Sequence, residues 1–338
     1  MWQNRNHALG ATHTRPRARP YRTTVTTEPH TDSGRRPGLP IDAWARQFDG
    51  WGCTTLLHDV TLADELRLDM PVPARVRGLL GKHHRALRCS TGATSCHGCE
   101  LLGSCPWPAL FERSEEENRL RSTQPFWLQT GTFERRARAG TELRARVGLV
   151  APMAHEAAWL GVALRDAMDT LAGCTTPSSL PAIGEQRVRL GQPAERWTVT
   201  LRTPAQIKGD PRRAREDCPQ APILPAIMRA AVRRLHGLAT WTPELQLDRV
   251  AWPDLRQVHA ESYEIRPARG TRYSFRQGQN VPLQGWVGSF TVAGDAMTAL
   301  SPLLDLIRTV GVGSGTTAGM GEISCARVET EAADEESS

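Results

Sequence analysis

The sequence predicts an α+β fold, because runs typical of β-strands alternate with runs typical of amphipathic helices in both halves of the chain. Residues 54–62 combine aliphatic and β-branched side chains, as strands do. Residues 156–171 repeat apolar side chains every three or four positions, as amphipathic helices do. With 338 residues, 39% of them hydrophobic, the chain is long enough for two domains of ordinary size.

In the first half, we expect a strand at residues 54–62 followed by a helix at 74–87. Pro71 and Pro73 precede this helix, and proline is favourable where a helix begins. The other expected elements are a strand at 143–149, a helix at 156–171 and a strand at 187–190.

The second half repeats this alternation, and Pro225 marks the start of its first helix. Its expected elements are a strand at 197–201, a helix at 225–238, strands near Val281 and at 288–292, a helix at 297–308 and a strand at 321–328. Each half is thus a plausible β-α-β-β-α-β unit.

The two ends of the chain differ from the part between them. From Met1 to about Pro40 the chain is rich in Arg, Thr, Pro, Gly and His and has almost no aliphatic side chains, so it cannot bury a core. We assign residues 1–48 to a disordered basic extension or to translation upstream of the true start, and we rank an RNA-binding arm below both. Residues 329–338 form an acidic tail that we expect to be solvated.

Charge and hydropathy narrow the classes of partner. A formal net charge of +6 and an isoelectric point near 9.1 fit a partner that carries phosphates. No stretch approaches the apolar length of a membrane span, and the N-terminus lacks the apolar core of a secretory signal. We therefore expect a cytoplasmic protein with reduced thiols and no membrane partner.

Five glycines fall between residues 311 and 321 (GVGSGTTAGMG). The spacing is neither that of a nucleotide-binding P-loop nor that of a Rossmann fingerprint. Glycine leaves backbone N–H groups open to a ligand, so such a loop can wrap an anionic backbone such as RNA. A plain turn between a helix and a last strand is the simpler alternative.

Six segments of the chain, taken in order, resemble one known family. The segments are 76–81 (VRGLLG), 105–112 (CPWPALFE), 203–208 (TPAQIK), 272–277 (RYSFRQ), 281–288 (VPLQGWVG) and 311–321, the glycine-rich loop. Together they resemble the CRISPR repeat-processing endoribonucleases of the RAMP superfamily, of the type with a C-terminal G-rich loop and a cysteine cluster. The resemblance runs from about Trp51 to about Arg327.

The resemblance implies two tandem ferredoxin-like (RRM-like) domains, at residues 49–192 and 193–328. A zinc-knuckle insertion is expected in the first, at about residues 88–113. Periodicity alone gives only the α+β class.

The resemblance also implies an endoribonuclease that binds the repeat hairpin of precursor CRISPR RNA and cleaves beside it. Cleavage in this family proceeds by attack of the ribose 2′-OH without a metal, and it leaves a 2′,3′-cyclic phosphate. The alternative is a catalytically inactive RNA-binding subunit of a CRISPR effector complex, whose other subunits would then be partners. A zinc-stapled nucleic-acid-binding protein with convergent motifs is a third hypothesis.

The cysteines suggest a metal. Cys89, Cys96, Cys99 and Cys105 lie within seventeen positions, and the inner pair has CxxC spacing. Four thiolates satisfy a tetrahedral zinc site, so we expect structural zinc. Replacement of one cysteine by His97, a disulfide and an iron–sulfur cluster are the alternatives that we rank lower.

Histidine suits proton transfer at neutral pH, and the helix after the RGLLG segment offers two. We prefer His84 as the catalytic residue, with His83 in reserve and Lys82 beside them; no cofactor is expected for catalysis. Neighbouring helical side chains diverge by about 100°, so only one histidine can face the scissile phosphate. A solvent-facing histidine pair is a nearly equal alternative, and His58 is a third candidate.

Arginines grip phosphates and stack on bases, so the RYSFRQ segment is expected to contact the RNA hairpin. The predicted RNA-binding residues are Arg272, Arg276, Gln277, Lys208, Gly311, Gly313, Gly315, Thr316, Thr317, Gly319 and Gly321. For the basic cluster that begins at Lys208, a solvated face is the slightly favoured alternative.

Overall fold

The computed structural model of the protein describes residues 38–93, 96, 98–102, 104–112, 123–208, 216–274 and 279–329. All of these belong to one compact unit, Pro37–Ser338. Residues 1–37 of the expected extension and 330–338 of the acidic tail lie outside the described residues. Among the helices of the described part, none combines the length and the apolar character that a membrane crossing needs.

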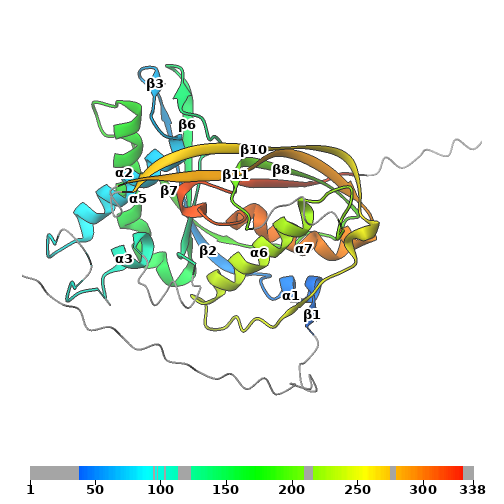
Figure 1. Ribbon diagram of the computed structural model, residues 1–338. Coiled ribbons are helices and arrows are strands. Elements are labelled where there is room, and N and C mark those ends of the chain that lie inside the picture. The colour runs from blue at the N-terminus through cyan, green and yellow to red at the C-terminus, as the bar shows by residue number, and fades with distance from the viewer. Residues whose placement is uncertain are drawn as a thin grey trace, which may run out of the picture. The chain divides into compact units, whose positions relative to one another are not determined.

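The first half is built on a four-stranded antiparallel sheet with the strand order β4-β6-β2-β7. Its elements follow one another as β-α-β-β-α-β, and helices α2 and α5 pack against each other (Figure 1). The elements are β2 (Gly52–Thr61), α2 (Val72–Arg88), β4 (Phe126–Gln129), β6 (Glu142–Val150), α5 (Ala157–Ala172) and β7 (Ala182–Arg187).

The second half repeats this arrangement with the antiparallel strand order β10-β11-β8-β12. Its elements are β8 (Arg196–Ala205), α6 (Leu224–Ala239), β10 (His259–Ser274), β11 (Gln279–Ala293), α7 (Asp295–Val310) and β12 (Ile323–Arg327). Numbered along the chain, the strands of both sheets have the order 2-3-1-4. The α+β class is confirmed, and both halves show the connectivity of the ferredoxin-like motif.

Three sequence-based predictions of strands are corrected. Residues 281 and 288–292 belong to one strand, β11, which pairs along most of its length with β10 in a long hairpin. Strand β10 was not anticipated from the sequence. The strand expected at 187–190 instead occupies Ala182–Arg187, at the edge of the first sheet.

Short elements complete the described part. They are β1 (Leu39–Pro40), α1 (Ile41–Arg46), β3 (Leu66–Arg67), α3 (Pro106–Phe111), β5 (Arg136–Ala137), β9 (Val250–Ala251) and the 3-10 turns η1 (Ala151–Glu156), η3 (Leu255–Gln257) and η4 (Thr316–Ala318).

The expected boundary of the disordered extension at residue 48 is wrong, because residues 38–48 are part of the fold. Leu39 pairs with Val250 in a parallel bridge, and α1 packs against α7. Trp44 and Phe48 are fully buried, and the Trp44 indole N–H donates to the carbonyl of Asp248 at 3.1 Å. Two buried aromatic side chains give this segment the apolar surface that residues before it lack.

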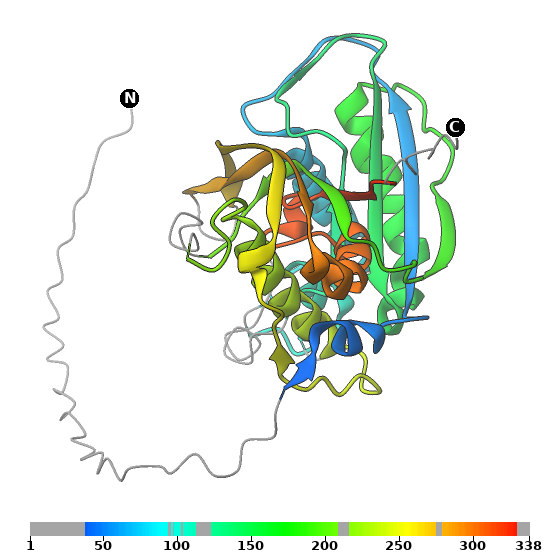
Figure 2. The same ribbon diagram turned by 90° about the vertical axis from the view of Figure 1, so that its right-hand side faces the viewer.

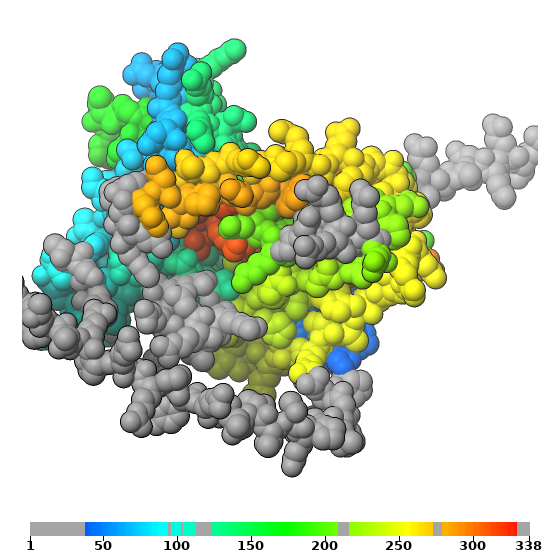
Figure 3. Space-filling model, viewed as in Figure 1, coloured from blue at the N-terminus to red at the C-terminus, as the bar shows by residue number. Residues whose placement is uncertain are grey.

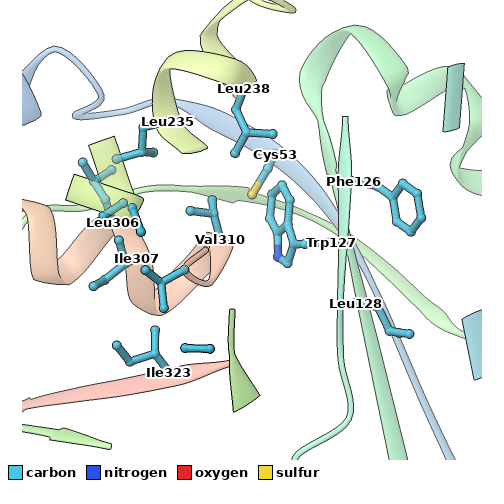
Figure 4. Close-up of a cluster of buried hydrophobic side chains, with 14 of the residues drawn as sticks. Cys53, Phe126, Trp127, Leu128, Leu235, Leu238, Leu306, Ile307, Val310 and Ile323 are labelled. Atoms are coloured by element: carbon cyan, nitrogen blue, oxygen red, sulfur yellow. The ribbon is translucent and has the colours of Figure 1, made fainter. Parts of the chain in front are cut away.

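The core extends through both halves. Because successive side chains of a strand point to opposite faces, β4 sends Trp127 toward α6 and α7, and Phe126 and Leu128 the other way (Figure 4). The Trp127 ring lies so close to Gly148 of β6 that any Cβ there would collide with it. On the opposite face, Leu56 of β2 lies beside Gly161 of α5. In Figure 2 the first sheet and α5 (blue and green) stand on one side of the second half (yellow to red).

Candidate nucleic-acid interface

Helix α2 organises the candidate site. It begins at Val72, after Pro71 and with Pro73 in its first turn, and it ends at Arg88. Residues seven apart lie on nearly the same face of a helix, as do residues four apart. Arg77, His84 and Arg88 therefore follow one another along one face of α2.

The glycine-rich loop, residues 311–321, connects α7 to β12 and is packed tightly against the rest of the protein. All five of its glycines have positive φ, from 68° to 80°. A Cβ at Gly319 would collide with Pro73 of α2. The loop also forms backbone hydrogen bonds with the end of β8, for example from Gly321 N–H to the carbonyl of Pro204 at 3.0 Å. The loop thus joins α2 of the first half to β8 of the second.

This packing corrects part of the predicted RNA contact. Gly311, Gly319 and Gly321 are buried, so their glycine identity serves backbone turns and close packing inside the protein. Gly313 and Gly315 are partly accessible, and Ser314 between them is exposed. The rim formed by residues 313–315 is therefore the part of the loop that can reach a ligand.

Thr316 and Thr317, also predicted to bind RNA, are buried as well. The Thr317 hydroxyl donates to Oε1 of Gln124 at 3.1 Å and accepts from Nε of Arg77 at 3.5 Å. Gln124 in turn donates from Nε2 to the carbonyl of Leu110 at 2.7 Å. The hydroxyl of Thr317 therefore ties the loop to α2 and to the segment before β4.

A small apolar cluster brings the β10–β11 hairpin to the same place. Ala74 of α2, Leu283 of β11 and Met320 of the loop are buried together. Gly270 of β10 lies against Pro71, at the beginning of α2. This contact places Arg272, two residues further along β10, at the junction of α2, the hairpin and the loop. Figure 3 shows the red-orange surface near the loop beneath the yellow and orange surface of the hairpin.

Arg77 and Arg272 form a pair of like charges at this junction. Burial, and then the positive charge of Arg272, lower the pKa of Arg77 to about 10. Burial also lowers the pKa of Arg272. Both side chains stay protonated at neutral pH, and within the described residues neither forms an ion pair with a carboxylate. We call Arg77, Arg272 and Thr317 the Arg77 cluster.

Three predicted binding residues remain: Lys208, Arg276 and Gln277. Lys208 is exposed, and it follows Gln206, whose backbone pairs with Ser314 of the rim. Arg276 and Gln277 lie outside the described residues.

His84, the preferred catalytic candidate, is buried and cannot contact a substrate; this prediction is corrected. Its Nε2 lies 3.2 Å from Oε2 of Glu156, which is also buried. Arg88 binds the same carboxylate through Nε at 3.1 Å and Nη2 at 2.9 Å. A carboxylate oxygen can only accept, so a neutral His84 ring donates its Nε2 proton to Glu156. Burial lowers the pKa of His84, against the opposing effect of the hydrogen bond to Glu156. We call these three residues the Glu156 cluster.

The neighbours of His84 differ from it. Lys82 is exposed, and His83 is half-buried. The Nε2 atom of His83 is buried and has no hydrogen-bond partner within the described residues. His58, the third candidate, is buried, and its Nε2 lies 3.1 Å from the hydroxyl of Ser178. Of the histidines proposed for catalysis, His83 alone is partly exposed as a residue.

The four clustered cysteines line one small pocket together with Arg85 and Thr91. None of them forms a disulfide, and the Thr91 hydroxyl lies 3.7 Å from the sulfur of Cys89 and 3.9 Å from that of Cys99. Across the described part of the chain, no three or more His, Cys, Asp or Glu side chains are arranged as ligands of a metal ion. The pocket therefore gathers the four sulfurs without placing them in coordination geometry.

Helix α3 follows the cysteines and lies against α2. The Trp107 indole N–H donates to the carbonyl of Gly81 at 3.0 Å, and the Phe111 ring packs on Gly81. The same ring lies 5.6 Å from the His84 ring and 5.7 Å from the guanidinium carbon of Arg77. Phe111 thus separates the Arg77 cluster from the Glu156 cluster.

Arg77, Gln124 and Glu156 take part in the site but were not predicted from the sequence. Arg77 stands inside the RGLLG segment that supports the resemblance, so its position was a usable signal. Gln124 and Glu156 reach their partners across 193 and 72 residues, respectively, and no local pattern marks such contacts.

Two family models match the chain. Residues 199–323 match the CRISPR-associated endoribonuclease Cas6, and residues 53–188 match a family described as an N-terminal domain. No curated protein matches the chain. The Cas6 match covers the strand with Arg272 and the glycine-rich loop. The second half of the chain is therefore similar to the CRISPR-associated endoribonuclease Cas6.

Solved structures with a similar fold are distant in sequence. A Cas6 product complex is 17% identical over 81% of this chain and 99% of that chain, with a TM-score of 0.42. Cas6 of Thermus thermophilus is 16% identical over 82% and 98%, with a TM-score of 0.38. A RAMP protein that binds different RNA substrates is 10% identical over 82% and 100%, with a TM-score of 0.39.

Proposed function

We propose that the protein binds the repeat hairpin of precursor CRISPR RNA and cuts the RNA beside it. The observation that carries this proposal is the Cas6 match at residues 199–323, which includes both Arg272 and the accessible rim of the glycine-rich loop. Arg77 and Arg272, which form no ion pair with a carboxylate of the described residues, support it, because phosphates bind where positive charge is not already neutralised.

The proposed reaction uses the RNA's own 2′-OH as the nucleophile. A base removes the hydroxyl proton, O2′ attacks the adjacent phosphorus, and the bond from phosphorus to O5′ breaks. An acid protonates the leaving O5′, so the products are a 2′,3′-cyclic phosphate and a 5′-OH. Arginine can stabilise the charge that develops on the phosphate, and no metal or other cofactor takes part. We assign the role of base to His83, because it is the one candidate histidine whose side chain is only half-buried and an imidazole can accept a proton.

The test is cleavage of a labelled repeat RNA in excess EDTA. The test uses two RNAs, the natural RNA and one with 2′-deoxyribose at the cut, and it compares the wild-type protein with the His83→Ala and His84→Gln variants. We expect the natural RNA to be cut at one position and the deoxy RNA to be bound intact. His83→Ala should slow cleavage about 10²–10⁴-fold. His84→Gln should cut at the wild-type rate, since glutamine can still donate to Glu156.

The inactive-subunit hypothesis stays open for one reason: the histidine that the sequence favoured is buried in the Glu156 cluster. Tight binding of the natural RNA without any cleavage would favour that hypothesis over ours. Cleavage that stops in EDTA and returns with a divalent ion would contradict the metal-independent mechanism.

We also propose that Cys89, Cys96, Cys99 and Cys105 hold a structural zinc ion. Their gathering in one pocket and their thiol chemistry support this, and coordination would require the sulfurs to close around the ion. The site would fix the segment that leads into α3. Metal analysis of protein purified without chelator should find one zinc ion per chain, and Cys96→Ser/Cys99→Ser should lose it. Wild-type protein without bound metal, and with a melting temperature unaffected by chelator, would disprove the site.

A further inference from the structure

We propose that Arg77, together with Arg272, forms a binding site for a phosphodiester group of the bound RNA, at the junction of α2, the β10–β11 hairpin and the glycine-rich loop. Nothing in the sequence patterns assigned Arg77 a function. The inference deepens the proposed function and rests on it for the identity of the ligand. The site itself is argued from the packing and charges of the described residues.

Arg77 forms two hydrogen bonds to other described residues. Its Nε donates to the Thr317 hydroxyl at 3.5 Å, and its Nη2 donates to the carbonyl of Phe111 at 3.4 Å. Both contacts are long, and both acceptors are neutral oxygens. A guanidinium has five N–H donors, so these two bonds leave most of its donor capacity unused.

Packing of the β10–β11 hairpin against α2 holds Arg272 near Arg77. Leu283 of β11 is opposite Gly270 in the hairpin and is buried with Ala74 and Met320. Gly270 touches Pro71, and a side chain at that position would press on Pro71 and on the Phe133 ring. The two guanidiniums are therefore held near each other by the hairpin's packing on α2, despite their repulsion.

Two half-buried cations that face each other repel, and burial penalises each of them. Two other partly buried arginines have an anion beside them: Arg88 has Glu156, and Arg327 has Asp305 at 2.5 Å. The Arg77 cluster has no such anion within the described residues. An external anion between the guanidiniums would relieve both the repulsion and the burial penalty, and arginine binds phosphate oxygens bidentately.

Arg77 and Arg272 are each partly exposed, and Gly78, beside Arg77, is exposed with open space around its Cα. The rim at residues 313–315 and Lys208 lie at the outer side of the same loop. One RNA strand could therefore place a phosphate at the arginine pair and run along the rim.

The experiment measures binding of the 2′-deoxy repeat RNA, which cannot be cut, to wild-type protein and to Arg77→Gln and Arg272→Gln over a range of salt concentrations. We expect each variant to bind about tenfold more weakly and to lower the slope of log K against log salt by about 1. Arg256→Gln is the matched control, because Arg256 is exposed and paired with Asp254. It should keep the wild-type slope.

Two further variants separate binding from folding. Arg77→Lys keeps the charge and should recover the salt slope but only part of the affinity. Thr317→Val removes the hydroxyl that Arg77 contacts but leaves both guanidiniums, so it should lower the slope less than Arg77→Gln does. If Thr317→Val reproduced the whole defect of Arg77→Gln, Arg77 would act by holding the loop, and the phosphate site would be wrong.

A second measurement does not depend on RNA. Inorganic phosphate should raise the melting temperature of the wild-type protein more than that of Arg77→Gln or Arg272→Gln. If Arg77→Gln and Arg272→Gln bound RNA with the wild-type affinity and salt slope, the inference would be overturned. The proposed function would remain intact. If no repeat RNA bound to the wild-type protein, the proposed function would fail. If phosphate raised the melting temperature of wild type and variants equally, the inference would fail, whatever the result with RNA.

Discussion

The Arg77 cluster and the Glu156 cluster are both built around an arginine of helix α2, but only the Glu156 cluster contains an anion. In each cluster the arginine of α2 binds a residue far along the chain: Arg77 contacts Thr317, and Arg88 contacts Glu156. The Glu156 cluster includes a buried carboxylate that accepts from Arg88 and His84, whereas the Arg77 cluster contains a second arginine and a neutral hydroxyl. The difference teaches that burial of a cation does not by itself reveal its role. The presence or absence of an internal anion separates a structural pair from a candidate binding site.

The largest effect on stability is expected from Arg88→Met. The substitution leaves the Glu156 carboxylate, only 1% exposed, without its cationic partner. Breaking a buried pair from one side costs about 3–5 kcal/mol in the free energy of unfolding. Urea denaturation measures this loss, and Arg256→Met, at an exposed ion pair, should change stability by less than about 0.5 kcal/mol. Equal stability of the two variants would remove the structural half of the comparison.

A smaller loss is expected from Gly319→Ala, which tests how the loop is held to α2. Gly319 has φ of 71° and lies against Pro73, whereas Gly140 has φ of 77° and open space around it. Gly140→Ala therefore measures backbone strain alone, about 1 kcal/mol. Gly319→Ala should cost about 1–3 kcal/mol and weaken RNA binding as well, since the loop must move away from α2. Equal costs for the two variants would show that contact with Pro73 contributes nothing.

The Glu156 cluster should also make stability depend on pH. The pKa of His84 is lowered by burial in the folded protein, so below the unfolded value of 6.5 the unfolded chain binds more protons. Stability is therefore full above pH 6.5 and falls as the pH is lowered, by at most about 1.4 kcal/mol per pH unit for this residue. Burial also lowers the pKa of His58 and His236, which add to the slope.

Thermal unfolding between pH 7.5 and 5.5 measures this dependence. His84→Gln should make it shallower. A steeper or unaltered dependence in His84→Gln would mean that His84 is not held neutral in the folded state.

The smallest effect, a gain, is expected at Gly78, which neighbours Arg77 but belongs to neither cluster. It lies inside α2, is exposed, and has nothing within contact of a new Cβ. Gly78→Ala should raise the free energy of unfolding by about 0.5–1 kcal/mol, because alanine loses less backbone entropy in a helix. Denaturant titration measures the gain. Weakened RNA binding in this variant would show that RNA approaches the α2 backbone at Gly78 more closely than we infer.

Elements with strong periodicity were predictable from the sequence. Helices α2, α5, α6 and α7 and strands β2, β6 and β8 lie where apolar spacing placed them, within a few residues at most ends. Strand β10 was missed because residues 259–274 are mostly exposed and polar, and they include Pro267 and Gly270. Their strand conformation depends on pairing with β11, which local spacing does not reveal.

The candidate site was predictable only in outline. The resemblance pointed to the loop and to Arg272, which do lie together, but it did not distinguish the exposed rim from the buried glycines and threonines. Adjacent histidines look equivalent in sequence, yet His84 faces Glu156 while His83 does not. The partner of His84 is 72 residues away, so tertiary packing decided which histidine was buried.

The most direct test of the central claim, that repeat RNA lies on the Arg77 cluster and the loop rim, is photo-crosslinking with an uncleavable repeat RNA that carries 4-thiouridine. Crosslinked peptides identified by mass spectrometry should come from residues 313–315, from the β10–β11 hairpin near Arg272 and from α2 near Arg77, and they should be lost on addition of unlabelled repeat RNA. Specific crosslinks confined to other surfaces, such as the groove beside Trp252 and Arg229, would contradict the account.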